Sequence, residues 1–114
     1  LPIWRLPNAA LAEIDLRKLT DYASSPDHPR GRHKARVFKA SLGLERRHAD
    51  RLAAALRRTL ADAPAREEGV DRWGARWRTD HVIDRDGRRA MVRCLWLLRA
   101  REDAPRLITC YVLQ

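Results

Sequence analysis

Apolar residues recur with a helical period in the first half of the chain. Between residues 15 and 62 they repeat every three or four positions, which predicts helices over about 16–23, 31–42 and 45–61. The buried stripes of these helices are expected to be Leu16, Leu19 and Tyr22, then Ala35, Phe38 and Leu42, then Leu52, Leu56 and Leu60. Gly43 stands where a glycine often closes a helix.

After Asp71 the apolar period changes to two, which is typical of β-strands. Strands are expected over 72–83, 89–98 and 106–113. The turn Asp84–Gly87 predicts a hairpin between the first two strands, because glycine supplies the positive φ that such turns need.

The order of these elements indicates a single α+β domain that spans residues 1–114. Residues 1–14 are expected to form an extended arm, with an edge strand as one form it can take. Residues 15–62 make the helical part, residues 65–69 a loop, and residues 71–114 the sheet. We therefore expect N-terminal helices packed on one face of a C-terminal antiparallel meander of at least three strands.

Alternation along the predicted strands separates two faces of the sheet. The mostly apolar face, which should meet the helices, includes Trp77, Thr79, His81, Cys94, Trp96, Ile108, Cys110 and Val112. The other face includes Arg76, Arg78, Asp80, Arg93, Leu107, Thr109 and Tyr111. The expected register places Tyr111 beside Arg93 and Arg93 beside Arg78. Such a row of arginines with a hydroxyl and a phenol suits phosphate, although an ordinary solvated face explains it equally well.

The same register places Cys94 opposite Cys110. A disulfide there would need suitable geometry. Two cysteines alone argue against a disulfide scaffold, and a buried reduced pair in a reducing cytoplasm is the favoured interpretation.

Net charge favours a polyanionic partner. The chain carries a formal charge of +9 at pH 7 and has a pI near 10.9, which suits RNA, DNA, an acidic protein or an anionic membrane surface. A solvated basic surface that keeps the protein in solution is the structural alternative. No apolar run reaches the roughly 20 residues of a membrane span, so no membrane partner is expected.

The cationic stretch from Asp27 to Gly43 is the main candidate for chemistry. The four histidines do not show the spacing of a metal site, so neither metal nor cofactor is expected. Metal-free RNA cleavage needs a base for the 2′-hydroxyl, cations for the phosphorane and an acid for the leaving oxygen. His28 is the first choice for proton transfer and His33 the second. In the structural alternative His28 caps the helix.

Phosphate binding in this scheme is assigned to Lys34, Arg36 and Arg32, and base stacking to Tyr111 or Trp96. Lys34 has a structural alternative as an ordinary solvent-facing cation on the helix flank.

Motifs distributed over nearly the whole chain resemble a known bacterial family. They are Leu6-Pro7-Asn8-Ala9, Arg17-Lys18-Leu19, His28-Pro29-x-Gly31-Arg32-x-Lys34-Ala35, Leu42-Gly43, Trp73-Gly74 and Pro105-Arg106-Leu107-Ile108-Thr109-x-Tyr111. The family is uncharacterised and occurs as small open reading frames and at the C-terminal tips of polymorphic toxins. It is loosely similar to the barnase, EndoU, colicin and RelE group of toxin ribonucleases, whose members join N-terminal helices to an antiparallel sheet.

This resemblance implies a metal-independent ribonuclease with His28, Lys34, Thr109 and Tyr111 as its catalytic residues. Substrate binding is then assigned to Arg32, His33, Arg36, Arg78, Arg93 and Arg106. A small acidic antitoxin or immunity protein is the implied partner besides RNA. The chain departs from the pattern in two places: a second catalytic histidine has no secure match, and Val112 follows Tyr111 where many related tails have proline.

Two other functions are compatible with the sequence. A non-catalytic RNA-binding or protein-interaction module would use the same charge without cleaving RNA. Another toxin chemistry, such as nucleotide or ADP-ribosyl transfer, lacks a recognisable NAD signature.

Overall fold

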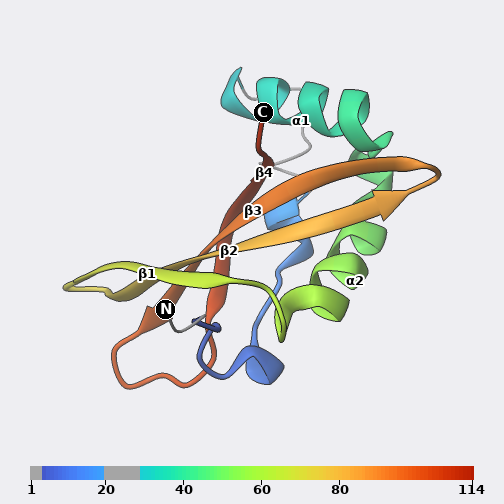
Figure 1. Cartoon of the computed structure of the whole chain (residues 1–114). Helices are drawn as coiled ribbons and strands as arrows, with labels where there is room; N and C mark the ends of the chain where they lie inside the picture. The colour runs from blue at the N-terminus through green and yellow to red at the C-terminus, as the bar shows by residue number, and fades with distance from the viewer. Residues whose placement is uncertain (1–3, 20–28) are drawn as a thin grey trace.

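A four-stranded antiparallel sheet forms the centre of the protein, and its strands follow one another in chain order (Figure 1). The computed structural model describes residues 4–19 and 29–114, and the side chains of residues 29–32 lie outside that description. The strands are β1 (Ala65–Asp71), β2 (Gly74–Arg85), β3 (Arg88–Arg99) and β4 (Arg106–Val112). The predicted α+β class and the antiparallel meander are therefore confirmed.

Strand β1 corrects the expectation of a loop at 65–69. Apart from Ala65, every residue of β1 is exposed, because the strand pairs only with β2 at the edge of the sheet. An exposed strand has no buried face and hence no alternating pattern that the sequence could display.

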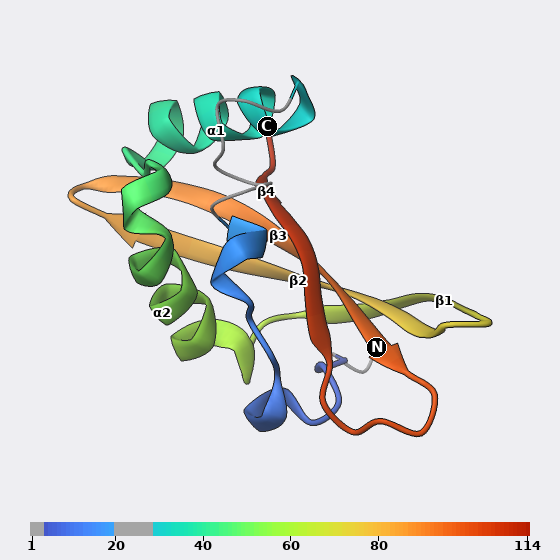
Figure 2. The same ribbon diagram turned by 180° about the vertical axis from the view of Figure 1, so that it is seen from behind.

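Two helices pack against the same face of the sheet (Figure 2). Helix α1 (Pro29–Leu42) contacts β3 and β4, whereas α2 (Ala49–Leu60) contacts β2. Two short 3₁₀ turns, η1 (Ala9–Leu11) and η3 (Arg46–His48), accompany them, and η3 replaces the first turn of the predicted 45–61 helix. The helices and the sheet enclose a core in which the fully buried side chains include Phe38, Leu42, Leu56, Val92, Cys94 and Trp96.

The predicted helix over 16–23 is described only as far as residue 19. Residues 16–19 are helical, and Leu19 is fully buried as expected. Leu16 is 47% exposed, so its assignment to the buried stripe is wrong. Tyr22 lies outside the described residues.

Within the described residues the N-terminal arm contacts the sheet near residue 13, and the Ala65 N–H at the start of β1 also donates to the Trp4 carbonyl at 2.9 Å. The Glu13 N–H donates to the Pro105 carbonyl at 2.8 Å, and the Leu107 N–H donates to the Glu13 carbonyl at 3.0 Å. This short parallel bridge covers the outer edge of β4 at its start.

The hairpin between β2 and β3 forms as the turn residues predict. Asp86 and Gly87 both have positive φ, of 49° and 78°, and Arg85 pairs with Arg88 across the turn. This turn type matches the right-handed twist of the flanking strands.

Two details of the sheet register differ from expectation. Arg93 pairs with Asp80 and not with Arg78, a shift of two residues that keeps both faces unchanged. Between β3 and β4 the register slips after the Leu95–Thr109 pair, because Ile108 is an extra residue on β4. Leu107 therefore turns into the core, and Ile108 is half-buried, the reverse of the predicted assignment.

Arginines from the β2–β3 hairpin fix the C-terminal end of α1. The Gly43 N–H donates to the Lys39 carbonyl and closes the helix with positive φ, as predicted. The Arg85 guanidinium donates to the Leu42 and Gly43 carbonyls at 3.1 and 3.0 Å, and Arg88 donates to Lys39 at 3.3 Å. Cations stabilise the partial negative charge at the C-terminal end of a helix. The two hairpin arginines therefore hold α1 in place over the sheet.

Replacing Gly74 by alanine is expected to destabilise the fold by about 2 kcal/mol. Gly74 has a φ of 140°, and an added Cβ would overlap the Leu98 carbonyl oxygen and lie 2.7 Å from the Arg99 Cα. Urea unfolding measures the loss. Gly69→Ala is the matched control, since Gly69 has a φ of 145° with open space around it. Equal losses in the two variants would contradict the role of the close approach to β3.

Candidate active site

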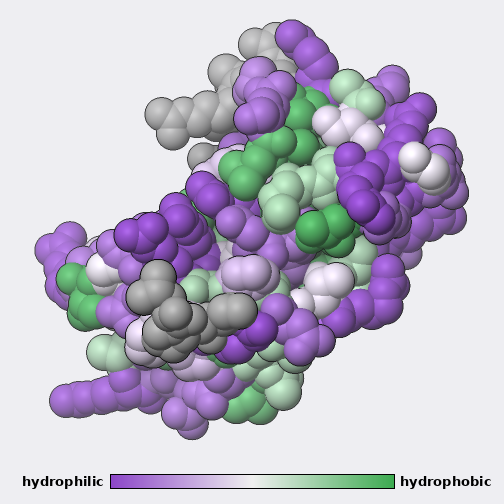
Figure 3. Space-filling view, viewed as in Figure 1, coloured by the Kyte–Doolittle hydropathy of each residue, from purple (hydrophilic) through white to green (hydrophobic). Residues whose placement is uncertain are grey.

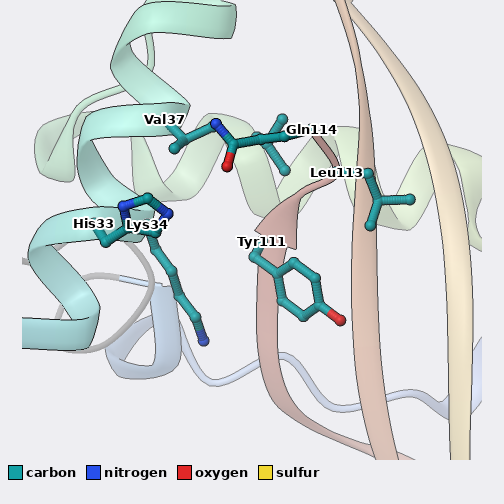
Figure 4. Close-up of a pocket in the computed structure, with 7 residues that line it drawn as sticks. His33, Lys34, Val37, Tyr111, Leu113 and Gln114 are labelled. Atoms are coloured by element: carbon teal, nitrogen blue, oxygen red, sulfur yellow. The ribbon is translucent and has the colours of Figure 1, made fainter.

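Lys34 reaches from α1 to two residues of β4 that lie far away in the sequence. Its Nζ donates a hydrogen bond to Thr109 Oγ1 at 2.9 Å, and the same nitrogen lies 5.5 Å from the centre of the Tyr111 ring. The side chain extends along the Tyr111 ring in Figure 4. The structure thus brings together three of the four residues predicted to be catalytic.

A pocket of about 340 Å³ opens beside this cluster, between α1 and the end of the chain. Helix α1 contributes His33, Lys34 and Val37, and the C-terminal segment contributes Tyr111, Val112, Leu113 and Gln114. His33 is exposed at this pocket, so it is accessible to a bound ligand. A polar, cationic side and an apolar side together suit a ligand that carries both phosphate and a base.

Arg93 holds Tyr111 from the sheet side. Arg93 pairs with Tyr111 across the β3–β4 ladder and with Asp80 across the β2–β3 ladder. Its Nε and Nη2 donate to the two Asp80 carboxylate oxygens at 2.8 and 3.0 Å, which lowers the pKa of Asp80. The hydrogen bonds to Asp80 raise the pKa of Arg93, and the cross-strand pairing places Arg93 next to Tyr111. The permanently charged guanidinium therefore lies against the Tyr111 phenol.

The remaining predicted substrate-binding residues are dispersed. Arg78 forms an ion pair with Glu68 at 3.1 Å, and Arg36 is exposed on α1. Arg106 lies at the opposite end of β4 from Tyr111 and pairs with Glu13 and Glu102 at 3.3 and 3.2 Å. The Arg32 side chain and the whole of His28 lie outside the described residues. The roles of these residues stay predictions.

Base stacking by Trp96 is ruled out by its position. Trp96 is fully buried, and its indole N–H donates to Thr79 Oγ1 at 2.9 Å within the core. Trp96 was already assigned from the sequence to the apolar face of the sheet, and the structure confirms this assignment. A residue on that face is covered by the helices and cannot stack a base. Tyr111, at the edge of the pocket, remains available.

Two of the four histidines have structural positions. His81 is buried between the hydroxyls of Thr59 and Thr79, and burial lowers its pKa to about 4. His48 Nδ1 accepts a hydrogen bond from the Glu45 N–H at 3.0 Å. The pKa of His48 is lowered, and burial is the largest cause. Neither ring faces the pocket beside Lys34.

Cys94 and Cys110 are free, buried thiols that face each other across β3 and β4. Burial raises the pKa of Cys94. A protonated thiol is a poor nucleophile and a poor metal ligand, so this pair belongs to the core. Among residues 4–19 and 29–114, no cluster of three or more His, Cys, Asp or Glu side chains is arranged to hold a metal ion.

Sequence reasoning missed the partner of Arg93 and the contribution of the C-terminal tail. Asp80 was placed on the correct face, but the two-residue register shift separated it from Arg93. The pairing of opposite charges across a ladder was the signal that could have corrected the register.

No helix in the described part of the chain is both long and apolar enough to cross a membrane.

The chain belongs to the DUF6883 family, a domain of unknown function whose model matches residues 5–114. No curated protein and no solved structure matches the chain significantly. The likeness to toxin ribonucleases therefore stays a prediction.

Proposed function

We propose that this protein is a metal-independent endoribonuclease of the toxin type, which cleaves RNA by attack of a 2′-hydroxyl on the adjacent phosphate. The observation that supports this most directly is the Lys34 ammonium hydrogen-bonded to Thr109 beside Tyr111 at the rim of a pocket. The net charge of +9 would draw an RNA strand toward the protein.

Each part of the reaction has a candidate group. A base removes the 2′-hydroxyl proton, the 2′-oxygen forms a bond to phosphorus, and the bond from phosphorus to the 5′-oxygen breaks. The departing 5′-oxygen takes up a proton. The products are a 2′,3′-cyclic phosphate and a 5′-hydroxyl, so protons balance without an external reagent.

Lys34 is suited to stabilise the negative charge that develops on the phosphorane oxygens. Thr109 fixes the position of the ammonium group, and its own hydroxyl can donate to phosphate. Tyr111, held by Arg93, is placed to stack a base or to supply a proton. His28 is our candidate for the base. His33, which lines the pocket beside Lys34, is the candidate for the second proton transfer.

The same proposal includes a partner and a place of action. A ribonuclease that acts on cellular RNA in the cytoplasm, of the producing cell or of a target bacterium, needs an inhibitor. A small acidic antitoxin or immunity protein would complement the basic surface and suppress activity by covering the site.

A non-catalytic RNA-binding or protein-interaction module is the second candidate. The dense exposed basic surface of α1 and α2 favours it, because phosphate contacts alone give salt-sensitive affinity. It predicts bound RNA that remains intact.

Analysis of the cleavage products tests the proposal. The protein is incubated in EDTA with end-labelled single-stranded RNAs of several sequences, and we expect fragments with 2′,3′-cyclic phosphate and 5′-hydroxyl ends. A substrate with one 2′-deoxynucleotide at the cleaved position should resist cutting there and be cut elsewhere. Intact RNA at high protein concentration across all substrates would overturn the ribonuclease, and salt-sensitive binding without products would favour the second candidate.

A further inference from the structure

A second pocket lies at the other end of the sheet face that carries Thr109. It has a volume of about 320 Å³ and lies where the β1–β2 turn, the end of β3 and the start of β4 meet. Trp73, Leu97 and Ile108 supply its apolar surface, and Lys18, Arg99 and Arg106 supply cations beside Glu13 and Asp15.

Trp73 is exposed in this pocket, in contrast to the tryptophans of the core. It is 49% exposed, whereas Trp77 and Trp96 are buried. The Arg72 guanidinium lies 4.7 Å from the centre of a Trp73 ring, which adds positive charge beside the aromatic surface. An exposed indole with adjacent cations is the combination that proteins use to stack nucleobases.

The β1–β2 turn holds Trp73 in a defined position. The Trp73 N–H donates to Asp71 Oδ1 at 2.8 Å, and the other carboxylate oxygen of Asp71 binds Arg76 Nε at 3.2 Å. The next residue, Gly74, packs directly on the Leu98–Arg99 backbone of β3. A preorganised side chain loses little conformational entropy when a ligand binds.

Two cations at this pocket are available to phosphate. Asp15 is paired with Arg17 at 2.8 Å, and Arg106 is paired with Glu13 and Glu102. Within the described residues, neither Lys18 nor Arg99 forms an ion pair of its own. The acids of the pocket are thus already neutralised, and Lys18 and Arg99 keep their charge for a ligand.

Residues of the open sheet face lie between this pocket and the Lys34 cluster. Thr109 pairs with Leu95, and two and four residues farther along β3 are Leu97 and Arg99. The distance from Leu95 to Arg99 is about 13 Å at the usual strand rise. Leu95 and Leu97 are half-buried, and they form an apolar floor between the two cationic ends. This open face is the one seen in Figure 3, where both apolar and hydrophilic side chains reach the surface.

We infer that the Trp73 pocket is a subsite for a nucleobase of single-stranded RNA, a few nucleotides from the phosphate bound at Lys34. This inference rests on the proposed function, since it assigns the class of substrate as single-stranded and longer than a dinucleotide. A base stacks on Trp73, Lys18 and Arg99 bind the neighbouring phosphates, and the strand crosses Leu95 and Leu97.

Substrates of two lengths test the subsite. We expect Trp73→Ala to raise the KM for an RNA of about eight nucleotides about tenfold, within the range of one stacking contact. Its kcat on that RNA, and its kcat/KM for a dinucleotide, should equal those of the unchanged protein. Trp73→Phe should recover most of the affinity because it keeps an aromatic face. Trp4→Ala is the matched control, since Trp4 is 61% exposed but does not line this pocket.

Binding of a non-cleavable 2′-O-methyl RNA octamer separates this inference from the ribonuclease. Weaker binding by Trp73→Ala with no cleavage of any RNA by the unchanged protein would support the subsite and overturn the ribonuclease. Equal affinity and equal KM in Trp73→Ala would overturn the subsite and leave cleavage unaffected. Loss of binding only to an inhibitory protein would likewise overturn the subsite and assign Trp73 to a protein interface.

Discussion

Lys34→Ala is expected to reduce the rate of RNA cleavage by about 100- to 1,000-fold, the usual effect of removing one donor that stabilises developing anionic charge. The Lys34 ammonium has a fixed position because Thr109 Oγ1 accepts its hydrogen bond at 2.9 Å. The Lys34 side chain is half-buried, so a water molecule that enters the variant cannot supply the positive charge of the missing ammonium group. The measurement is kcat/KM on one RNA with a single cleavage site, in EDTA, for variants whose circular dichroism and melting temperature show a folded protein.

Three further variants make the result specific. Lys34→Met keeps the aliphatic stem and should lose as much activity as Lys34→Ala, which separates the charge from the packing. Thr109→Val removes only the hydroxyl and should cost about tenfold, the value of one hydrogen bond. Lys39→Ala removes the other lysine of α1, which is exposed, pairs with Glu45 at 3.5 Å and lines no part of the pocket. This variant should leave the rate unchanged. A folded Lys34→Met with full activity would remove Lys34 from the mechanism.

The sequence predicts those structural elements that are determined by residues close together in the chain. The stripe that contains Phe38 and Leu42 must be buried on one side, and Gly43 alone permits the left-handed closure of the helix. Asp86 and Gly87 determine the hairpin for the same reason. The pairing of Cys94 with Cys110 follows from a simple count across the β3–β4 connection.

Features that depend on tertiary contacts were not predictable in this way. Strand β1 has no buried face, so its pairing with β2 leaves no trace in hydropathy. The bulge at Ile108 reverses Leu107 and Ile108, although both residues are apolar and either could face the core. The register of β2 against β3 depends on whether the turn contains two residues or four, and both choices keep the same faces.

The candidate site was predictable in part. Lys34 was chosen from the flank of a cationic helix and from the family resemblance, and the structure brings it to Thr109 and Tyr111. That meeting joins residues 75 positions apart, and only the fold can establish it. His33 was the second choice for proton transfer, and it lines the pocket because the C-terminal tail passes alongside α1.

A chain of hydrogen bonds inside the core favours a neutral His81. The Trp96 indole donates to Thr79 Oγ1 at 2.9 Å, so the Thr79 hydroxyl can donate onward to His81 Nε2 at 2.7 Å. The Thr59 hydroxyl donates to carbonyls of α2 at 3.0 and 3.2 Å, so it accepts from His81 Nδ1 at 2.7 Å. With these directions every group is satisfied when His81 is neutral with its proton on Nδ1.

This arrangement predicts that the fold loses about 3 kcal/mol of stability through His81 as the pH falls from 7 to 4. The folded pKa is lowered to about 4 by burial, whereas an unfolded histidine titrates near 6.5. Between these values the unfolded chain binds the additional proton, so stability is fully present above about pH 6.5 and declines toward pH 4. Urea unfolding at closely spaced pH values measures the slope.

The contribution of His81 is isolated by comparison with His81→Gln, because carboxylates such as Asp80 also weaken the fold in acid. Glutamine can both donate and accept but does not titrate, so we expect this variant to be less stable at pH 7 and to lose about 3 kcal/mol less than the unchanged protein on acidification. His33→Gln changes an exposed histidine and should follow the curve of the unchanged protein. Parallel curves for His81→Gln and the unchanged protein would show that the folded protein accommodates a protonated His81, and that the Thr59 or Thr79 hydroxyl can reverse its direction.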